Sequence, residues 1–345
     1  MKILKKILCT FLIIIMCLTS APLSGFVGIE LPDFSEWFAD KASATEELAA
    51  TGQCGDNVYW NYDSITGGLT ITGTGAMYDY DYYEYRSPFY YSDIKTVVIE
   101  NGVTTIGSEA FYNCASLTSI TIPSCVTTIS SEAFYSCTGL TSITIPNSVT
   151  TIGSSAFNDC EKLTSVTIPG SVTKIGDYAF YDCNSLVNLI ISYGVTTIGR
   201  YAFRGCNSLT SITIPGSVTT IGDDVFLYCS NLTSINVDKN NTVYSNDSKG
   251  VLFDKNKTVL IHYPIGNTDA SYTIPDGVTI IGEYAFRDCT NLKSITIPSS
   301  VVTIYDGAFK NCESLTSITI PDSVKNIGDE DVNVEYANLI VERVA

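Results

Sequence analysis

Residues 140–160 read LTSITIPNSVTTIGSSAFNDC, and close copies of this segment recur along most of the 345-residue chain. A phenylalanine stands every 23 residues from Phe111 to Phe226, and Phe286 and Phe309 are again 23 residues apart. The unit can be written LxxIxIPxxVxxIGxxAFxxCxx. One unit cannot bury its apolar side alone, whereas stacked units form a continuous core. The sequence therefore predicts a solenoid of 23-residue coils.

Each part of the unit predicts a different local structure. Ile143 and Ile145 alternate with polar residues, which favours a short strand with one buried face. Pro146 has no amide hydrogen and ends that strand, and residues 149–152 form a second extended segment. The spacing of Ala, Phe and Cys in residues 156–160 favours one or two helical turns. The predicted fold class is an α/β-type repeat solenoid, with a parallel β-sheet on one face and short helical or 3-10 turns on the other.

The pattern IPxxVxxIGxxAFxxC resembles the BspA-like leucine-rich repeats, also called the Treponema pallidum type, of secreted and surface proteins. The resemblance covers residues 94–328. Single units depart from the pattern. The proline is replaced by Ser192 and Asp238, the turn glycine by Ser130 and Tyr305, the alanine by Val225 and the phenylalanine by Val332. The resemblance implies a leucine-rich-repeat solenoid that adheres to host matrix proteins or to other cells.

The start of the chain predicts export. Three lysines precede the apolar residues 7–18, and this run is too short to span a bilayer with ease. We expect residues 1–44 to be a signal peptide and leader, cleaved after residue 21 or residue 44. An uncleaved anchor is the alternative. The expected location is extracellular or associated with the cell surface.

Three further regions follow the leader. Residues 45–93 are predicted to form an N-terminal β-hairpin cap that ends in a tyrosine-rich segment, and residues 94–328 the solenoid. Phe226 and Phe286 are 60 residues apart, which indicates an insert at about 238–271. Two β-type runs within this insert, joined by four polar residues, predict a hairpin. Residues 329–345 are expected to form a degenerate C-terminal cap.

The composition excludes several classes of function. The chain has 36 acidic and 19 basic residues, a net charge of −17, so a nucleic-acid partner would be repelled. His262 is the single histidine, which excludes a histidine-rich zinc site and a mechanism that needs two imidazoles. Because hydrolase and phosphate-loop motifs are also missing, we expect no catalytic residues, no metal, no cofactor and no small-molecule substrate.

The cysteines follow the repeat. Eight of the twelve stand three residues after a repeat phenylalanine, at Cys114, Cys137, Cys160, Cys183, Cys206, Cys229, Cys289 and Cys312. We call this set the cysteine ladder. Parallel side chains do not converge as a disulfide requires, so we expect small buried residues with a structural role. Cys54 and Cys125 lie outside the ladder, and a disulfide between them stays open.

One candidate binding surface is the outer face of the strands. A threonine recurs there at equivalent positions, namely Thr121, Thr144, Thr167, Thr213, Thr296 and Thr319. We call this set the threonine row. Extended faces of repeat proteins commonly bind partners. The alternative is that threonine favours strands and keeps them soluble.

A second candidate is an aromatic cluster before the first coil. Its members Tyr78, Tyr80, Tyr82, Tyr83 and Tyr85 form the tyrosine patch. Tyrosine buries a large area at a small cost in rotamer freedom, so a protein or a sugar ring can dock there. Alternatively, these side chains cover the first coil. We expect Phe89 and one or two tyrosines in the core, and Tyr80 and Tyr82 exposed.

These observations predict an exported, non-catalytic binding protein. The expected partner is a protein on a host or neighbouring cell surface, or a glycan. Two alternatives remain: a structural spacer of the cell envelope, and a glycan-binding module that uses the tyrosine patch.

Overall fold

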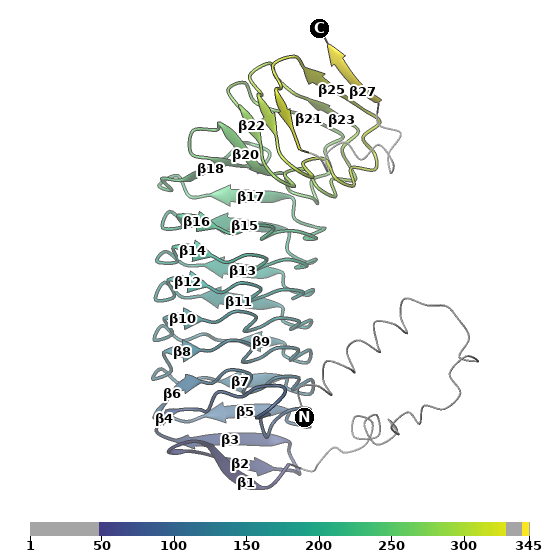
Figure 1. Ribbon diagram of the computed structural model, residues 1–345. Helices are drawn as coiled ribbons and strands as arrows, with labels where there is room; N and C mark the ends of the chain where they lie inside the picture. The colour runs from purple at the N-terminus through teal and green to yellow at the C-terminus, as the bar shows by residue number, and fades with distance from the viewer. Residues whose placement is uncertain (1–47, 329–339, 345) are drawn as a thin grey trace, which may run out of the picture. The chain divides into compact units, whose positions relative to one another are not determined.

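The computed structural model describes residues 48–328 and 340–344. They belong to a compact unit that starts at Glu47, and their strands lie one above another in a stack of coils (Figure 1). Residues 1–44, predicted as signal peptide and leader, lie outside the described residues, and so does most of the predicted C-terminal cap.

The first sheet has eight strands, in spatial order β1 (Thr51–Gly55), β2 (Val58–Asp63), β3 (Gly68–Gly73), β5 (Thr96–Ile99), β7 (Ser119–Thr121), β9 (Ser142–Ile143), β11 (Ser165–Ile168) and β13 (Asn188–Ile191). The next two coils supply a two-stranded sheet, β15 (Ser211–Ile214) and β17 (Ser234–Val237). Beyond the insert, four strands pair in the order β21 (Ser271–Thr273), β23 (Ser294–Thr296), β25 (Ser317–Pro321) and β27 (Ile340–Val344). The pairs β1–β2 and β2–β3 are antiparallel, and the later pairs are parallel.

A second set of strands comes from the other extended segment of each unit. Seven of them pair, and in chain order they are β4 (Gly75–Ala76), β6 (Val103–Ile106), β8 (Thr128–Ile129), β10 (Thr151–Ile152), β12 (Lys174–Ile175), β14 (Thr197–Ile198) and β16 (Thr220–Ile221). Six more follow in the order β18 (Tyr244–Asn246), β19 (Leu252–Asp254), β20 (Val259–His262), β22 (Ile280–Ile281), β24 (Thr303–Ile304) and β26 (Asn326–Ile327). The solenoid with parallel sheets is confirmed, and each regular coil contributes to two sheets rather than one.

The predicted helical turns are wrong, because no helix occurs among the described residues. Ser155 and Asp159 adopt left-handed backbone angles, with φ of 54° and 60°, and equivalent residues of other coils do the same. The amide of Phe157 donates to the carbonyl of Ala179 in the next coil at 2.8 Å, while the amides on either side bond within their own turn. Such alternation is incompatible with the regular hydrogen bonds of a helix. Within the described segments, nothing forms an apolar helix of membrane-spanning length.

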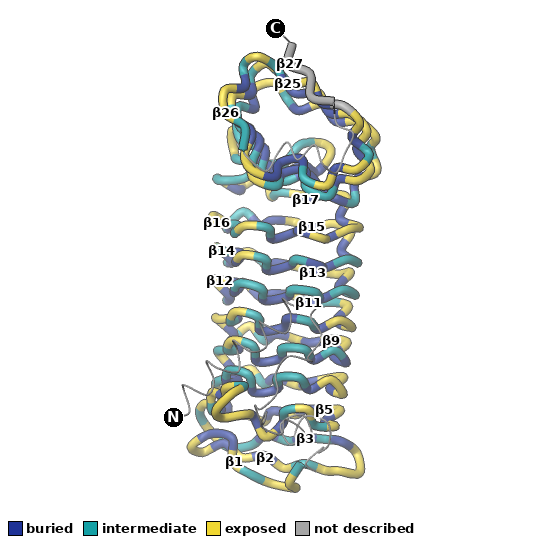
Figure 2. Tube along the Cα trace, turned by 45° about the vertical axis from the view of Figure 1, so that its right-hand side comes forward, coloured by how far each residue is buried: buried dark blue, intermediate teal, exposed yellow. Residues whose placement is uncertain are grey.

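The core is a stack of phenylalanine rings. Phe157 lies parallel to Phe134 at 5.3 Å and to Phe180 at 5.1 Å. Phe89 begins the stack from the N-terminal cap and is fully buried, as predicted. Buried residues recur at the same places in successive coils (Figure 2). Equivalent residues therefore pack on one another by translation along the stack.

The insert forms a coil that is longer than the repeat, with 37 residues from Phe226 to Tyr263, but that has a shorter turn. Strands β19 and β20 form an antiparallel hairpin, and β20 also pairs in parallel with β22. The amide of Tyr263 donates to the carbonyl of Ala285 at 2.8 Å, so Tyr263 occupies the position of a repeat phenylalanine. Two residues separate Leu260 from Tyr263, whereas four separate Ile281 from Phe286. This coil is thus two residues shorter at its turn, and the solenoid is hollowed there.

Candidate binding surfaces

The threonine row lies on the outer face of the first set of strands, and its six side chains are exposed. Their hydroxyls make no hydrogen bond within the described chain. By contrast, Thr141 on the same side of the coil and Thr150 beside β10 of the second set of strands donate to carbonyls of the preceding coil at 3.2 and 3.3 Å. The threonine row is interrupted at Val98 and Ile190, which pair in register with Thr121 and Thr167. This face therefore combines free hydroxyls with isolated apolar side chains.

One coil carries three exposed apolar residues, two in or beside β13 on this face and one in the turn after the strand. Val187, Ile190 and Tyr193 are 48%, 58% and 77% exposed. We call them the exposed apolar patch. Val187 and Ile190 stand where the preceding coil has Thr164 and Thr167. Because apolar side chains on one coil break a surface of hydroxyls, this patch marks a candidate interaction site.

The tyrosine patch is only partly a surface feature. Tyr83 and Tyr85 are 81% and 55% exposed, and Tyr78 and Tyr82 are half-buried. The prediction of an exposed Tyr80 is wrong, because this side chain is 5% exposed and stacks on Tyr85 at 5.3 Å. The Tyr80 amide donates to a carbonyl of the next coil at 2.9 Å, so this segment follows the solenoid and turns the ring inward.

The aromatic surface extends further along the turns than the tyrosine patch. The position after the repeat phenylalanine carries, in successive coils, Tyr90, Tyr112, Tyr135, Asn158, Tyr181 and Arg204. The Tyr112 and Tyr135 rings are parallel at 4.7 Å. Sequence reasoning missed this row because its members lie a full repeat apart. Comparing that one position across the units is the signal that would have found it.

A groove of about 550 Å³ lies on this turn side, and we call it the arginine–tyrosine groove. Its lining residues are Tyr135, Asn158, Tyr178, Tyr181, Tyr201, Arg204, Leu227 and Arg287. None of them is acidic. A chain with a net charge of −17 thus presents a groove lined by two arginines.

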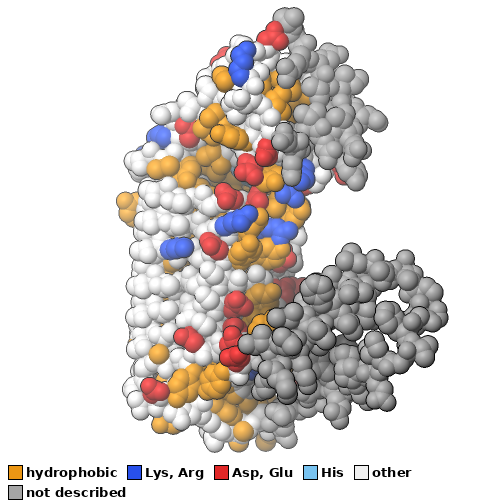
Figure 3. All heavy atoms as spheres, in the orientation of Figure 1, with side chains coloured by type: hydrophobic (Ala, Val, Ile, Leu, Met, Phe, Trp, Pro, Cys, Tyr) orange, Lys and Arg blue, Asp and Glu red, His pale blue; other side chains and the backbone are white. Residues whose placement is uncertain are grey.

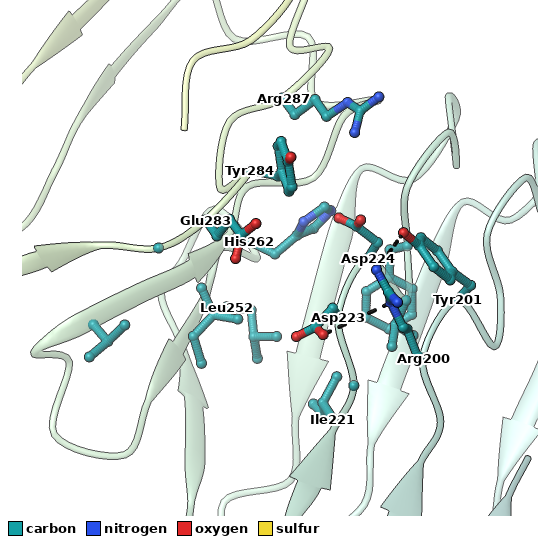
Figure 4. A pocket seen from close by; sticks show the side chains of 16 residues that line it. Arg200, Tyr201, Ile221, Asp223, Asp224, Leu252, His262, Glu283, Tyr284 and Arg287 are labelled. Atoms are coloured by element: carbon teal, nitrogen blue, oxygen red, sulfur yellow. Dashed lines mark hydrogen bonds and ion pairs between the residues drawn. The ribbon is translucent and has the colours of Figure 1, made fainter. Parts of the chain in front are cut away.

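A second hollow of about 380 Å³, the junction cleft, lies at the shortened turn of the insert coil (Figure 4). Ile221 and Leu252 contribute apolar surface. The Nε2 atom of His262 is buried and has no hydrogen-bond partner within the described chain, and burial lowers the pKa of His262 to about 4. Burial also raises the pKa of Asp224 and of Glu283. The cleft therefore holds polar groups that the repeat does not satisfy.

Two arginines of the junction cleft are paired. Arg200 donates to the Tyr201 hydroxyl at 3.0 Å and lies 4.0 Å from Asp223. Arg287 lies 3.4 Å from Asp288. Among the described residues, no group of three or more His, Cys, Asp or Glu side chains is placed to hold a metal ion.

All eight members of the cysteine ladder are buried as free thiols. The Cys160 thiol donates to the Phe134 carbonyl at 3.3 Å, and burial raises its pKa well above the usual value. Cys54 and Cys125 are also free thiols, so the structure contains no bridge between them. Cys125 donates to the Val103 carbonyl at 3.2 Å, the bond that serine makes at this position in other coils.

The chain matches the model of the BspA type Leucine rich repeat region in six copies, over residues 85–184, 150–248 and 268–334. A leucine-rich repeat protein from Eubacterium ventriosum is 30% identical, with a TM-score of 0.56, covering 86% of this chain and 72% of that one. A leucine-rich cell surface protein from Faecalibacterium prausnitzii is 29% identical, with a TM-score of 0.60, covering 84% and 94%.

The pneumococcal vaccine antigen PcpA shares the fold at 22% identity, with a TM-score of 0.55, covering 81% of this chain and 78% of that one. No curated protein matches the chain. The family match covers more than half of the sequence and the same repeat that forms the stacked coils. The chain belongs to the family of proteins with BspA-type leucine-rich repeats.

Proposed function

We propose that this protein is exported, performs no catalysis, and binds a protein ligand at or near a bacterial cell surface. The exposed apolar patch on the outer strand face carries this proposal. Most of the binding energy of an interface comes from a few central side chains, and tyrosine is enriched among them. Val187, Ile190 and Tyr193 supply such a centre, and the surrounding hydroxyls supply a polar rim.

The distribution of charge supports the same face. From Thr118 to Asn236, the outward positions of the first set of strands carry Thr, Ser, Asn, Val or Ile and no charged residue. In the view of Figure 3, charged side chains, with hydrophobic ones among them, gather along one side of the coils. A partner therefore meets this strand face without the repulsion that a net charge of −17 causes elsewhere.

The cell-surface location rests on the family and on the leader expected at residues 1–44. The Faecalibacterium relative is described as a cell surface protein. The leucine-rich-repeat architecture supports binding by shape on a rigid scaffold. The tyrosine patch, through the exposed Tyr83 and Tyr85, is the second proposed contact area for a protein or a glycan.

The test is a pull-down of the mature protein with immobilised extracellular-matrix proteins. The variant Val187→Thr/Ile190→Thr copies the residues of the preceding coil, so its fold should be unchanged. We expect this variant to lose binding and the Tyr83→Ala/Tyr85→Ala variant to retain most of it. Binding that survives the first variant and fails in the second would place the interface at the tyrosine patch. Self-association in sedimentation, with no binding to any matrix protein, would favour the envelope spacer instead.

A further inference from the structure

The arginine–tyrosine groove differs in chemistry from the rest of the molecule. Four tyrosines, two arginines, one asparagine and one leucine line it. Asp182 and Asp159 belong to the same turns but do not line the groove. Because Arg287 is ion-paired with Asp288, Arg204 is the cation of the lining that has no acidic partner within the described residues, on a chain with 17 more acidic than basic residues. An unpaired cation attracts an anion.

Arg204 is held without an acidic partner. Its guanidinium carbon lies 4.6 Å from the ring centre of Tyr181 and 4.7 Å from that of Tyr228. No described carboxylate lies within ion-pair distance of Arg204, whereas Arg200 and Arg287 each have one. Contacts with aromatic rings hold the side chain in place and leave its N–H donors for a planar anion.

The other lining groups fit the ring of a sugar. Tyr178 and Tyr201 lie 5.0 Å apart and half-buried, so they add aromatic surface beside Arg204. The side-chain amide of Asn158 makes no hydrogen bond within the described chain, although the residue is 8% exposed. An amide has two donors and an acceptor for hydroxyl groups. A volume of about 550 Å³ is in the range of small-molecule sites.

We propose that the arginine–tyrosine groove binds a saccharide that carries a carboxylate, with the carboxylate on Arg204 and the sugar ring against the tyrosines. This site lies on the turn side and is separate from the strand face proposed for the protein ligand. The carboxylate matches the fork of the guanidinium, and the ring hydroxyls match the Asn158 amide. The two binding activities can therefore be lost independently.

The test is isothermal titration of the full chain at neutral pH and low salt, with glucuronic acid and N-acetylneuraminic acid as probes. We expect both acids to bind and glucose and N-acetylglucosamine to bind at least about tenfold more weakly, because they lack the group that pairs with Arg204. Added salt should weaken the binding of the acids, because the contact is between charges. Equal binding of the neutral sugars would overturn the proposal.

Two variants distinguish binding at this groove from attraction by the overall charge of the protein. Arg204→Leu places in this coil the residue that the next coil has at the same position, Leu227, so we expect it to fold and to bind the acids at least about tenfold more weakly. Lys174→Thr removes the same charge from the exposed side of β12, copies Thr151 and Thr197 of the adjacent coils and lies outside the groove lining, so its affinity should be unchanged. Equal losses in both variants would show non-specific attraction and overturn the proposal.

Two further probes test the sugar itself. Sodium acetate should not displace the acidic sugars at the concentrations at which those sugars bind. Displacement by acetate would show a site for simple anions and overturn the assignment to a saccharide. An oligoglutamate peptide that binds as tightly as the sugars would also overturn the assignment. Binding of the matrix protein by Arg204→Leu should remain at the wild-type level, so failure of one proposal leaves the other intact.

Discussion

The regular coils and the junction at the insert differ in how they pack and hydrogen-bond similar side chains. In the regular coils, Phe157 packs between two other phenylalanine rings, and the Cys160 thiol donates to the carbonyl of a preceding coil. At the junction, Phe226 has a ring of the stack on one side, at 6.3 Å, and His262 on the other, at 6.0 Å. In the regular coils each group packs on the equivalent group of the neighbouring coil, and the shortened turn of the insert coil removes that equivalent neighbour.

The consequence is visible in the polar groups. The Nε2 atom of His262 and the hydroxyl of Tyr263 are buried without a hydrogen-bond partner in the described chain. Arg200 and Arg287 line the junction cleft, and Arg204 lies in the adjoining groove. Charged side chains and unpaired polar groups thus gather where the insert interrupts the repeat, while the regular coils form the rigid scaffold.

The largest expected loss of stability comes from a substitution that breaks the phenylalanine stack. Phe157→Ala should reduce the free energy of unfolding by about 3–5 kcal/mol, because the ring is fully buried and packed on both sides. Phe226→Ala should cost clearly less, because Phe226 already borders the junction cleft. Urea unfolding followed by circular dichroism measures both losses. Equal losses would show that the junction is packed as tightly as the regular coils.

The second prediction concerns His262. Its pKa is lowered from 6.5 to about 4 in the folded protein, so the unfolded chain takes up a proton first on acidification. The stabilisation from the neutral ring is therefore full above pH 6.5 and is lost as the pH falls towards 4. Relative to wild type, His262→Gln should become more stable by about 3 kcal/mol between neutral pH and pH 4.

The carboxyl groups of the junction act in the opposite sense. Burial raises the pKa of Asp224 and Glu283, so their protonation on acidification favours the folded state. Because wild type and His262→Gln share these groups, the difference between the two pH profiles isolates the histidine. Urea midpoints at several pH values give that difference. Parallel profiles would contradict a buried, neutral His262.

The sequence predicted well what repeats, because a residue in the regular coils has its own copies as neighbours. Ile143 and Phe157 are buried as the unit pattern requires. The turn conformation was not predictable from spacing alone. Inward positions one, three and four residues apart fit a helical turn, but also the observed turn with left-handed Ser155 and Asp159. The two kinds of turn differ only in whether each backbone amide donates its hydrogen bond within its own coil or to the next coil.

The candidate sites were less predictable, since they depend on neighbours far apart in sequence. The local alternation of the sequence predicts an exposed Tyr80, but its segment pairs with the next coil and the side chain is buried. Arg204 meets Tyr181 and Tyr228 from the coils on either side. The junction cleft depends on the two residues missing before Tyr263, which a hairpin prediction for the insert does not reveal.

A smaller effect is expected in the cysteine ladder. Cys160→Ala should cost about 1 kcal/mol, because it removes a buried sulfur and a weak hydrogen bond. Cys125→Ser copies the equivalent Ser148 and should stay within about 0.5 kcal/mol of wild type. Both are measured by urea unfolding under reducing conditions. A larger loss for Cys125→Ser would contradict the equivalence of the two positions.

The same cysteines give a chemical test. In the folded protein a thiol reagent should modify the half-buried Cys125 first, because burial shields the ladder and keeps Cys160 and its neighbours protonated. In unfolded protein that has never been reduced, all ten described cysteines should titrate as thiols. Fewer than the eight thiols of the ladder would show that disulfides cross-link the coils.

The smallest effect distinguishes two kinds of exposed threonine within the regular coils. The Thr150 hydroxyl donates to the Thr127 carbonyl at 3.3 Å, whereas Thr144 of the threonine row has no partner in the described chain. Thr150→Val should therefore cost about 0.5 kcal/mol, and Thr144→Val should be close to neutral because valine also favours strands. Urea midpoints resolve this difference when both variants are compared with wild type. Equal midpoints would mean that the hydrogen bond from the Thr150 hydroxyl to the Thr127 carbonyl adds no measurable stability.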